Sequence, residues 1–450
     1  MKKILLATLA SFGLLLTCTV LAGEDSLTIE ISAGQLDRES DPVTLRLPAD
    51  WAGKKHLVLK SESGDKSLPV QKIDSNSIAW FLVDPLNAGE KRRYQLSVSE
   101  EPIAQTDRVT CVDENGRLSL LYGDRPILRY NYAIQKAPEG IDPVYNRSGY
   151  IHPLYSPDGR ELTGDFPADH AHQHAIFNPW VNTVFEGREV DFWNQAKETG
   201  MIEHARILNT FSGPVCGGFT ISLRHIDRSA PGGPKEVLNE TWTVRAWKSG
   251  GQFVVDLKSV QKCSSNSKLT MKEYRYGGMA LRGNHQWFDA KLATELNRFP
   301  KKLEKDPTAK PSVRAPFEFL TSEGHDVFSG NHTAARWVDM SGKIDGNVTG
   351  TTVLSHPKNF RAPQKVRLHP SKPYFCFAPM VDGDFVIESG SPYVSRYRYL
   401  LRDGKPDAND IDRSWEQYAA PMVARTIVDR RGKKVSGAAQ DVGGFPKVGG

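Results

Sequence analysis

The sequence predicts an all-β protein, with a large two-sheet domain preceded by a small β-sandwich module. Apolar and polar residues alternate in many short segments, such as residues 26–32, 94–98 and 393–401, and this period of two is typical of strands. Gly, Pro, Asn and Asp bound nearly all of these segments, as turns require. Few windows show the 3.6-residue period of a helix. A chain of 450 residues is long enough for two domains or one large β-architecture.

The first 22 residues have the organisation of a secretory signal peptide. A basic start precedes an apolar stretch at residues 4–16, and residues 20–22 offer a small-residue cleavage site. The apolar stretch is shorter than the roughly 20 residues that a transmembrane helix needs. We therefore expect export to the periplasm or the exterior. A lipid-anchored form at Cys18 is less favoured, because Thr17 is a poor residue before an acylated cysteine.

The remaining residues predict two domains and a tail. We expect a small β-sandwich module at residues 23–105, where the first alternating segments lie, with a linker near residues 99–107. A large β-sandwich domain is expected at residues 106–425. Residues 426–450 are rich in glycine and carry a basic cluster, which predicts a flexible basic tail.

Helical periodicity is confined to two windows of the large domain. Residues 288–305 form one window, interrupted by Pro300, and residues 414–419 form the other, with Ser414 as its candidate N-cap. The rest of the domain has strand and turn signals. Two curled sheets packed face to face are expected, because one open sheet of this length would expose a long edge.

Composition and motif content exclude several classes. The net charge of +5 is small for this length, so no nucleic-acid partner is indicated. No segment after residue 22 is apolar enough to span a bilayer. The four later cysteines contain no Cys-x-x-Cys pair, which argues against structural zinc and leaves disulfides or buried thiols open. The nucleophile elbow, the phosphate-binding loop, the dinucleotide fingerprint and the His-Glu-x-x-His motif are absent.

The densest chemical signal is the run Asp-His-Ala-His-Gln-His at residues 169–174. Three of the twelve histidines fall within these positions. Alternate side chains of a strand share one face, so we expect His170, His172 and His174 on one face of a strand that lines a cleft. Imidazoles can transfer protons at neutral pH. Asp169 and the three histidines are therefore the candidate catalytic residues.

Two other interpretations of this run remain open. His170 and His172, at strand spacing with Cα atoms about 6–7 Å apart, could converge on one divalent metal ion, although the sequence identifies no third ligand. A metal cofactor is therefore neither required nor excluded. Alternatively, the histidines could simply form hydrogen bonds to buried carbonyl groups.

Polar clusters elsewhere supply candidate substrate-binding residues. One surrounds the histidine run and includes a tryptophan, whose ring can stack on the apolar face of a sugar. A glycine-rich segment at residues 275–285 contains an arginine that could hold a carboxylate or a pair of hydroxyls. A segment held extended by prolines follows at residues 355–363. The candidates are Arg147, His152, Asp191, Trp193, Arg282, His356, Asn359 and Arg361.

Taken in order, these clusters resemble an exported bacterial family labelled methane oxygenase PmoA. The resemblance covers about residues 115–405. Its motifs are Tyr-Ile-His-Pro-Leu at 150–154, Pro-Ala-Asp-His-Ala-His at 167–172, Asp-Phe-Trp at 191–193, Tyr-Gly-Gly-Met-Ala-Leu-Arg at 276–282, His-Pro-Lys-Asn-Phe-Arg-Ala-Pro at 356–363 and Tyr-Arg-Tyr at 397–399. Many relatives have Arg-Gly where this chain has His174 and Ala175. This change replaces a fixed cation by a titratable group and restricts the backbone.

The resemblance implies a PmoA-like domain, but the oxygenase activity in the label is not expected. A membrane oxygenase needs transmembrane helices and a complete set of metal ligands, and the sequence offers neither. The late motifs are similar to those of mutarotase-like supersandwich folds, a likeness that suggests a sugar ligand.

We therefore expect an exported carbohydrate-active protein. The favoured hypothesis is an enzyme, a hydrolase, lyase or epimerase, that acts on a small-molecule or oligosaccharide ligand by histidine-based acid–base chemistry. One alternative is a non-catalytic glycan-binding or cell-envelope protein. The other is a metal-dependent enzyme that uses His170 and His172.

Overall fold

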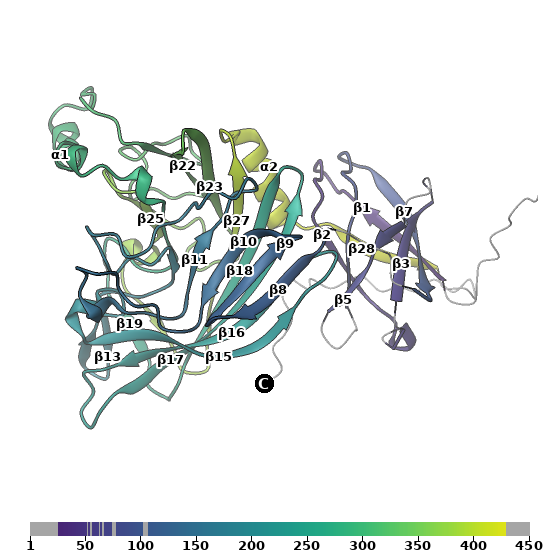
Figure 1. The fold of residues 1–450 in the computed structure, drawn as a ribbon, viewed down its shortest axis with the longest axis horizontal. Coiled ribbons are helices and arrows are strands. Elements are labelled where there is room, and N and C mark those ends of the chain that lie inside the picture. The colour runs from purple at the N-terminus through teal and green to yellow at the C-terminus, as the bar shows by residue number, and fades with distance from the viewer. Residues whose placement is uncertain are drawn as a thin grey trace, which may run out of the picture.

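The structure is a computed structural model that describes residues 26–428, except residues 52, 55, 63, 65–66, 74–77 and 102–106. The predicted signal peptide, most of the predicted linker and the chain from residue 429 onward lie outside the described residues. Nearly all the regular structure of the described part consists of strands, as Figure 1 shows, so the predicted all-β class is confirmed. No helix in this part of the chain is both long and apolar enough to cross a membrane.

Two antiparallel sheets form the N-terminal module. One has the spatial order β28 (Val423–Val428), β1 (Ser26–Ser32), β7 (Lys91–Ser99), β3 (His56–Ser61) and β4 (Ser67–Pro69). The other has the order β2 (Pro42–Arg46), β6 (Ile78–Leu82) and β5 (Gln71–Ile73). Alternate side chains of β1, such as Ile29 and Ile31, pack with Val43 of β2 and Phe81 of β6 in a core of their own. The predicted small β-sandwich is confirmed.

The end of the described chain returns to this module. β28 pairs antiparallel with β1, with Ala424 opposite Ile31, and so covers an edge of β1 that would otherwise be unpaired. The predicted boundary at residue 425 therefore falls inside a strand, and residues 426–428, predicted as tail, belong to that strand. The sequence analysis missed this strand because its alternating segment is short and is followed by a glycine-rich stretch.

Two eight-stranded sheets form the large domain. The first has the order β24 (Val366–Leu368), β25 (Tyr374–Phe377), β20 (Ala280–Arg282), β12 (Ile176–Phe177), β11 (Tyr150–Leu154), β10 (Arg125–Asn131), β9 (Arg117–Tyr122) and β8 (Val109–Glu114). The second has the order β15 (Gly200–Phe211), β16 (Gly217–Asp227), β17 (Lys235–Ser249), β18 (Gln252–Cys263), β27 (Tyr393–Asp403), β23 (Asn347–Ser355), β22 (Trp337–Ile344) and β21 (Phe317–Thr321). Leu118 and Leu120 of the first sheet share one buried core with Phe219 and Ile221 of the second. The predicted large two-sheet sandwich is thus confirmed.

A small sheet and two helices complete the domain. The sheet has the order β14 (Arg188–Val190), β13 (Thr183–Phe185), β19 (Leu269–Met271) and β26 (Phe385–Ile387). Helix α1 (Ala290–Lys305) accommodates Pro300. Helix α2 (Ala408–Ala419) begins after Asp407, whose carboxylate accepts the amides of Asn409 and Asp410. The predicted cap Ser414 therefore lies inside α2. Asp407 caps the helix instead, and the first turn that follows it is polar, so this turn was not recognised from the apolar pattern.

The N-terminal module is docked on the outer face of the second large sheet. β17 alternates between the inner core, where Val244 packs, and this outer face, where Trp247 packs with Trp80 of the module and Tyr418 of α2. Arg398 of β27 joins the two parts with an ion pair to Asp41 at 2.9 Å. Figure 1 shows the module to one side of the large sandwich, with the chain passing from α2 into the module as β28.

Candidate functional site

Residues 167–173 form two consecutive turns and not the predicted strand. The amide of His170 donates to the carbonyl of Pro167, and the amide of Gln173 donates to the carbonyl of His170, both at 2.9 Å. Ala175 then has a φ of +45°, in the left-handed region. The three histidines therefore do not share one face. Proline fixes its own φ and favours a turn, and this signal outweighed the period of two.

The turns place two of the three histidines at a cavity of about 330 Å³. His170 and His172 line it beside Asp169, with ring centroids 5.3 Å apart, and Asp142 and Tyr145 contribute from the preceding loop. The complete lining is Gly140, Ile141, Asp142, Tyr145, Ala168, Asp169, His170, Ala171 and His172. This volume is at the small end for ligand sites, and so many polar groups suit a hydroxylated ligand better than an apolar one.

His174 is absent from the cavity lining and is fully buried. Its Nδ1 is 2.8 Å from Asp165 Oδ1, its Nε2 is 3.0 Å from Gln195 Oε1, and the Tyr150 hydroxyl donates to Asp165 Oδ2 at 2.6 Å. Burial raises the pKa of Asp165, but the hydrogen bond and charge of His174 outweigh burial, so the net shift is downward. His174 is placed to fasten the turns onto β11, not to meet a ligand.

Asp169 is held by two cations. Arg282 of β20 reaches Asp169 Oδ1 at 2.9 Å and also donates to Gln173 at 2.8 Å, while Lys372 Nζ lies 3.3 Å from Asp169 Oδ2. Burial raises the pKa of Asp169, but a hydrogen bond from His170 and the charges of Arg282 and Lys372 bring it well below its usual range. Asp169 therefore remains an ionised carboxylate at the edge of the cavity.

His170 has a hydrogen-bond partner in either protonation state. Its Nδ1 is 2.6 Å from Lys372 Nζ and 3.3 Å from Asp169 Oδ2. An unprotonated Nδ1 can accept from the ammonium, and a protonated Nδ1 can donate to the carboxylate. This arrangement pairs Nδ1 of the half-buried His170 ring whether or not that nitrogen carries a proton.

Two other imidazoles beside His170 are neutral at neutral pH. Burial, followed by the charge of His170, lowers the pKa of His172 to about 3. His369, whose ring centroid is 6.4 Å from that of His170, has its pKa lowered to about 2 by burial and by the charges of Arg367 and Lys372. These two rings are suited to hydrogen bonding and not to carrying charge.

Arg147 and His152 lie outside the cavity lining, Arg147 buried and His152 half-buried. Arg147 is 3% exposed, and its guanidinium stands 5.7 Å from the ring centre of Phe177. Burial lowers its pKa to about 10. His152 Nδ1 is 3.0 Å from the hydroxyl of Thr163, and burial lowers the pKa of His152 to about 4. Neither side chain lines the cavity.

The low pKa of His152 predicts a loss of stability in acid. The unfolded chain takes up this proton near pH 6.5, whereas the folded chain takes it up only near pH 4, so the free energy of unfolding falls as the pH drops through that window. The loss is at most roughly 3 kcal/mol, since one pKa unit corresponds to about 1.4 kcal/mol. Urea unfolding at pH 7 and at pH 4.5 measures it. His152→Gln should flatten the pH dependence and His56→Gln should not; equal slopes in both variants would contradict the assignment.

Asp191 and Trp193 build a local turn within the core. Asp191 accepts hydrogen bonds from the backbone amides of Trp193 and Asn194, and it forms an ion pair with Lys197 at 2.9 Å. Trp193 is 1% exposed, and its ring centre lies 5.0 Å from that of Tyr276. The ring predicted to stack on a sugar therefore has no free face. Sequence composition alone did not separate a core tryptophan from a surface one.

His356, Asn359 and Arg361 form a separate group. The ring of His356 packs on Tyr418 of α2, and Asn359 donates a hydrogen bond to the carbonyl of Arg396. The guanidinium of Arg361 donates to the backbone carbonyls of Pro379, Gly383 and Asp384. Within the described part of the chain, none of their hydrogen bonds reaches the histidine cavity. They fix the predicted loop in place, and no contact joins them to Asp169 or Arg282.

Sequence reasoning missed three residues of the site: Arg367, His369 and Lys372. They lie in and just after β24, in the stretch Arg-Leu-His-Pro-Ser-Lys-Pro at residues 367–373. The available signal was a second His-Pro pair followed by a lysine and another proline, which is the composition that marked residues 356–363. β25 pairs with β20, which brings this stretch next to Arg282.

The donor set does not complete the hypothesised metal site. His170 and His172 lie close together, but no three His, Cys, Asp or Glu side chains of the described residues are grouped so that they could hold a metal ion. The Nδ1 of His170 also faces the ammonium of Lys372. A third ligand, which a catalytic zinc site normally has, is thus missing from this pair.

We therefore expect purified protein to carry no stoichiometric transition metal. Plasma mass spectrometry before and after chelation checks this, together with the thermal midpoint, which should not change when the chelator is added. A bound metal at one ion per chain that is lost in His172→Ala but kept in His56→Ala would contradict the expectation.

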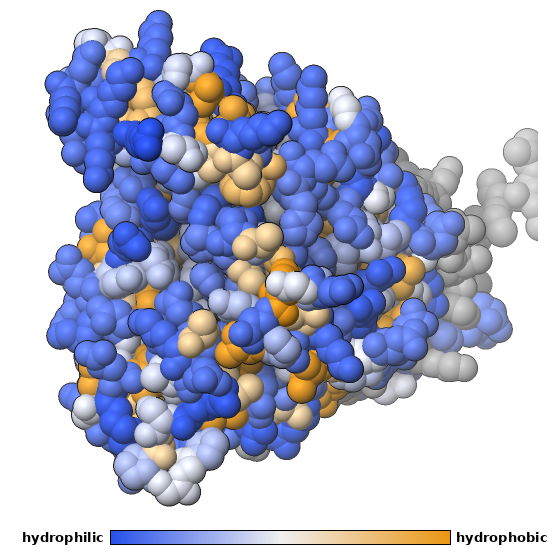
Figure 2. All heavy atoms as spheres, turned by 60° about the vertical axis from the view of Figure 1, so that its left-hand side comes forward, coloured by the Kyte–Doolittle hydropathy of each residue, from blue (hydrophilic) through white to orange (hydrophobic). Residues whose placement is uncertain are grey.

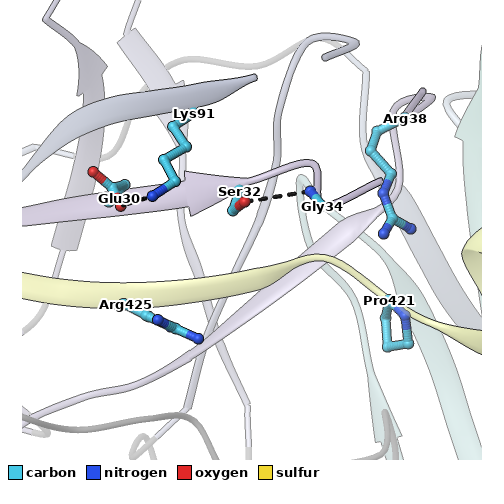
Figure 3. A pocket seen from close by; sticks show the side chains of 7 residues that line it. All are labelled: Glu30, Ser32, Gly34, Arg38, Lys91, Pro421 and Arg425. Atoms are coloured by element: carbon cyan, nitrogen blue, oxygen red, sulfur yellow. Dashed lines mark hydrogen bonds and ion pairs between the residues drawn. The ribbon is translucent and has the colours of Figure 1, made fainter. Parts of the chain in front are cut away.

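A second cavity, of about 270 Å³, lies in the N-terminal module beside β28 (Figure 3). Its charged groups serve the fold: Arg38 donates to the carbonyls of Ala33 and Ala420, and Glu30 pairs with Lys91 at 3.7 Å. No histidine or cysteine lines it. We therefore place the candidate chemistry at the cavity of His170 and His172.

A comparison with protein-family models gives a match over residues 117–416, two thirds of the chain. The matching family is described as a family of unknown function, DUF6807. The chain belongs to the DUF6807 family. This finding overturns the PmoA label that the motifs suggested, although the matched range contains all of those motifs. The motifs lie within the range that matches the family model, but the family label inferred from them was wrong.

No curated protein matches this DUF6807 chain. The solved structures that are similar to it include the following two. One is an alpha-mannosidase from Enterococcus faecalis V583, with a TM-score of 0.40 and 11% identity, covering 92% of this chain and 47% of that one. The other is a protein in glycosyl hydrolase family 38 from Enterococcus faecalis, with a TM-score of 0.40 and 10% identity, covering 93% and 49%. The chain spans about half the length of each, and at this similarity neither informs on its activity.

Proposed function

We propose that this DUF6807 protein is an exported enzyme that transfers a proton to or from a sugar, or a sugar derivative, bound at the cavity of His170 and His172. The observation that carries the proposal is the setting of His170. Its ring lines a polar cavity, and its Nδ1 has both an ammonium donor and a carboxylate acceptor. Export rests on the organisation of residues 1–22.

The roles follow from the geometry. Lys372 Nζ lies 2.6 Å from Nδ1 and 3.1 Å from Nε2 of His170, while Asp169 lies on the Nδ1 side, so we assign the proton exchange with the ligand to the imidazole of His170 without choosing between its nitrogens. His172, neutral and 5.3 Å away between ring centroids, would donate or accept a hydrogen bond to a hydroxyl. Arg282 acts as a positioning residue, since it holds both Asp169 and Gln173.

The cavity favours a hydroxylated ligand. Asp142, Tyr145, Asp169 and the two histidines offer convergent polar groups, whereas the apolar side chains in the lining are Ile141 and two alanines. Such a lining would leave an apolar ligand facing unsatisfied polar atoms. A small sugar ring satisfies them with its hydroxyls, although the aromatic stacking predicted for Trp193 is not part of this site.

A non-catalytic glycan-binding protein is the second candidate. It is favoured by the low pKa values of His172 and His369, which describe hydrogen-bonding and not proton-transferring rings. The experiment that separates the two is a screen of mono- and oligosaccharides and sugar acids for both binding and turnover, from pH 5 to pH 8. Turnover that changes across this range supports the enzyme. Binding without turnover, unaffected by pH, would replace it by the second candidate.

A further inference from the structure

We infer that the ligand of this cavity carries a carboxylate, so that the substrate class is a uronic acid or another sugar acid. The inference rests on the proposed function and adds the charge of the substrate to it. Its basis is a group of side chains next to the cavity, Arg275, Arg282, Arg367 and Lys372, which we name the cationic cluster.

The cationic cluster has too few acids to balance it. Arg282 and Lys372 share one carboxylate, that of Asp169. Arg367 donates to Asn331 Oδ1 at 2.9 Å and to the carbonyl of Leu368, which are neutral acceptors. Arg275 stands over the rings of Tyr274 and Tyr276. Across the described residues, neither Arg275 nor Arg367 has an ion pair, so four cations meet one carboxylate.

The strand register places two of these arginines on one face of the first large sheet. Arg367 of β24 lies opposite Cys376 of β25, and Cys376 lies opposite Ala280 of β20, two residues before Arg282. After burial, the charges that lower the pKa of His369 most are those of Arg367, Lys372, His170 and Arg282, all cationic or titrating to a cation. The pKa of Arg367 is itself lowered by burial, with Arg275 as a further contributor. Uncompensated cations in a partly buried site cost stability, which an anionic ligand would restore.

The other nearby acids are already engaged. Asp382 pairs with Lys365 at 2.7 Å, and Asp191 pairs with Lys197 at 2.9 Å. Asp142, the other carboxylate in the cavity lining, accepts a hydrogen bond from the amide of Val144. None of these carboxylates contacts the cationic cluster, so none neutralises it.

Lys372 joins the cationic cluster to the cavity, because its ammonium contacts His170 and Asp169, which line the cavity. Lys372 Nζ touches the ring of His170, and the ring of His369 lies beyond it, partly exposed. A carboxylate held here would place the attached sugar ring against His170 and His172. Guanidinium groups bind carboxylates in a fork of two parallel hydrogen bonds, which suits the arginines of this group.

The test is a titration of the full mature protein, with all histidines ¹⁵N-labelled, by sodium D-glucuronate and by D-glucose at low salt. We expect the signals of His170 and His172 to shift with both sugars, and glucuronate to bind at least about tenfold more tightly, a difference of about 1.4 kcal/mol. Arg367→Gln should bring glucuronate to the affinity of glucose. Arg275→Gln, at an exposed position, should weaken it as well if Arg367→Gln fails to fold. Arg298→Gln, which removes the same charge from the exposed side of α1, should change nothing.

The outcomes separate the inference from the proposed function. Equal affinities for glucose and glucuronate, with both histidine signals shifting, would overturn the inference and leave the function standing. Tighter binding of a sulfated or phosphorylated glucose than of glucuronate would overturn the carboxylate. Binding of acetate and phosphate at the cationic cluster without binding of either sugar would support the anion site and overturn the function. No response of either histidine to any of these probes would overturn both.

Discussion

Replacing Arg398 by glutamine is expected to lower the free energy of unfolding by about 3–5 kcal/mol. Arg398 binds Asp256 with two hydrogen bonds, at 2.7 and 3.0 Å, and Asp41 with a third at 2.9 Å. Its guanidinium also stands 4.9 Å from the ring centre of Trp247. Without it, two carboxylates are left facing each other at the buried contact between the module and the large domain.

The pH dependence of this loss has a definite sign. Burial raises the pKa of Asp41, and the charge of Asp256 raises it further, while Arg398 opposes both. Once Arg398 is gone, a protonated Asp41 is tolerated and an ionised one is not. A raised folded pKa costs stability as the pH increases through it, so the deficit should be larger at pH 7 than at pH 4.5.

Urea unfolding of wild type and variant at both pH values measures the effect. Arg396→Gln, two residues earlier on the same strand and without an ion pair among the described residues, is the matched control and should cost less than about 1 kcal/mol. Asp41→Asn combined with Arg398→Gln should recover part of the loss. A deficit for Arg398→Gln no larger than that of the control would show that the module is not fastened by this residue.

The second large effect is on activity: His170→Ala is expected to reduce kcat by about 10²- to 10⁴-fold on the substrate that the screen identifies. This is the usual contribution of a positioned general acid or base. His172→Ala should mainly raise KM, because a neutral ring that binds a hydroxyl contributes to the ground state and the transition state alike.

Lys372→Met gives an independent readout of the same site. The variant removes the ammonium that contacts His170 at 2.6 Å and Asp169 at 3.3 Å, so kcat should fall although both residues are still present. His56→Ala, on β3 of the N-terminal module, should leave kcat unchanged. If His170→Ala retains full kcat with a folded protein, proton transfer by this residue is refuted.

Much of the fold could be predicted because a period of two depends only on neighbouring residues. The segments at β1, β7 and β27 were all predicted in this way. The pairing of β28 with β1 was not, because the partners are nearly 400 residues apart in the sequence and no local signal names a partner. Asp407 capped α2 earlier than the apolar pattern suggested, since capping depends on a side chain outside that pattern.

The site was predicted in part. The histidine run was located, but alternation alone could not distinguish a strand from the two turns that Pro167 begins. Trp193 was expected to stack on a sugar, whereas the structure buries its ring. Lys372 comes from a segment 200 residues away, placed by the pairing of β25 with β20. Contacts of this kind depend on tertiary structure, so they cannot be predicted from the local amino-acid composition.

The central claim, that ligand binds at His170 and His172, is tested most directly by a crystal structure of His170→Ala with the substrate that the screen identifies. The account predicts electron density in the 330 Å³ cavity, between Tyr145 and His172, with a polar ligand atom near the position that the imidazole has left. Density in the cavity beside Arg38, or against the loop of His356 and Arg361 with the histidine cavity unchanged, would contradict it.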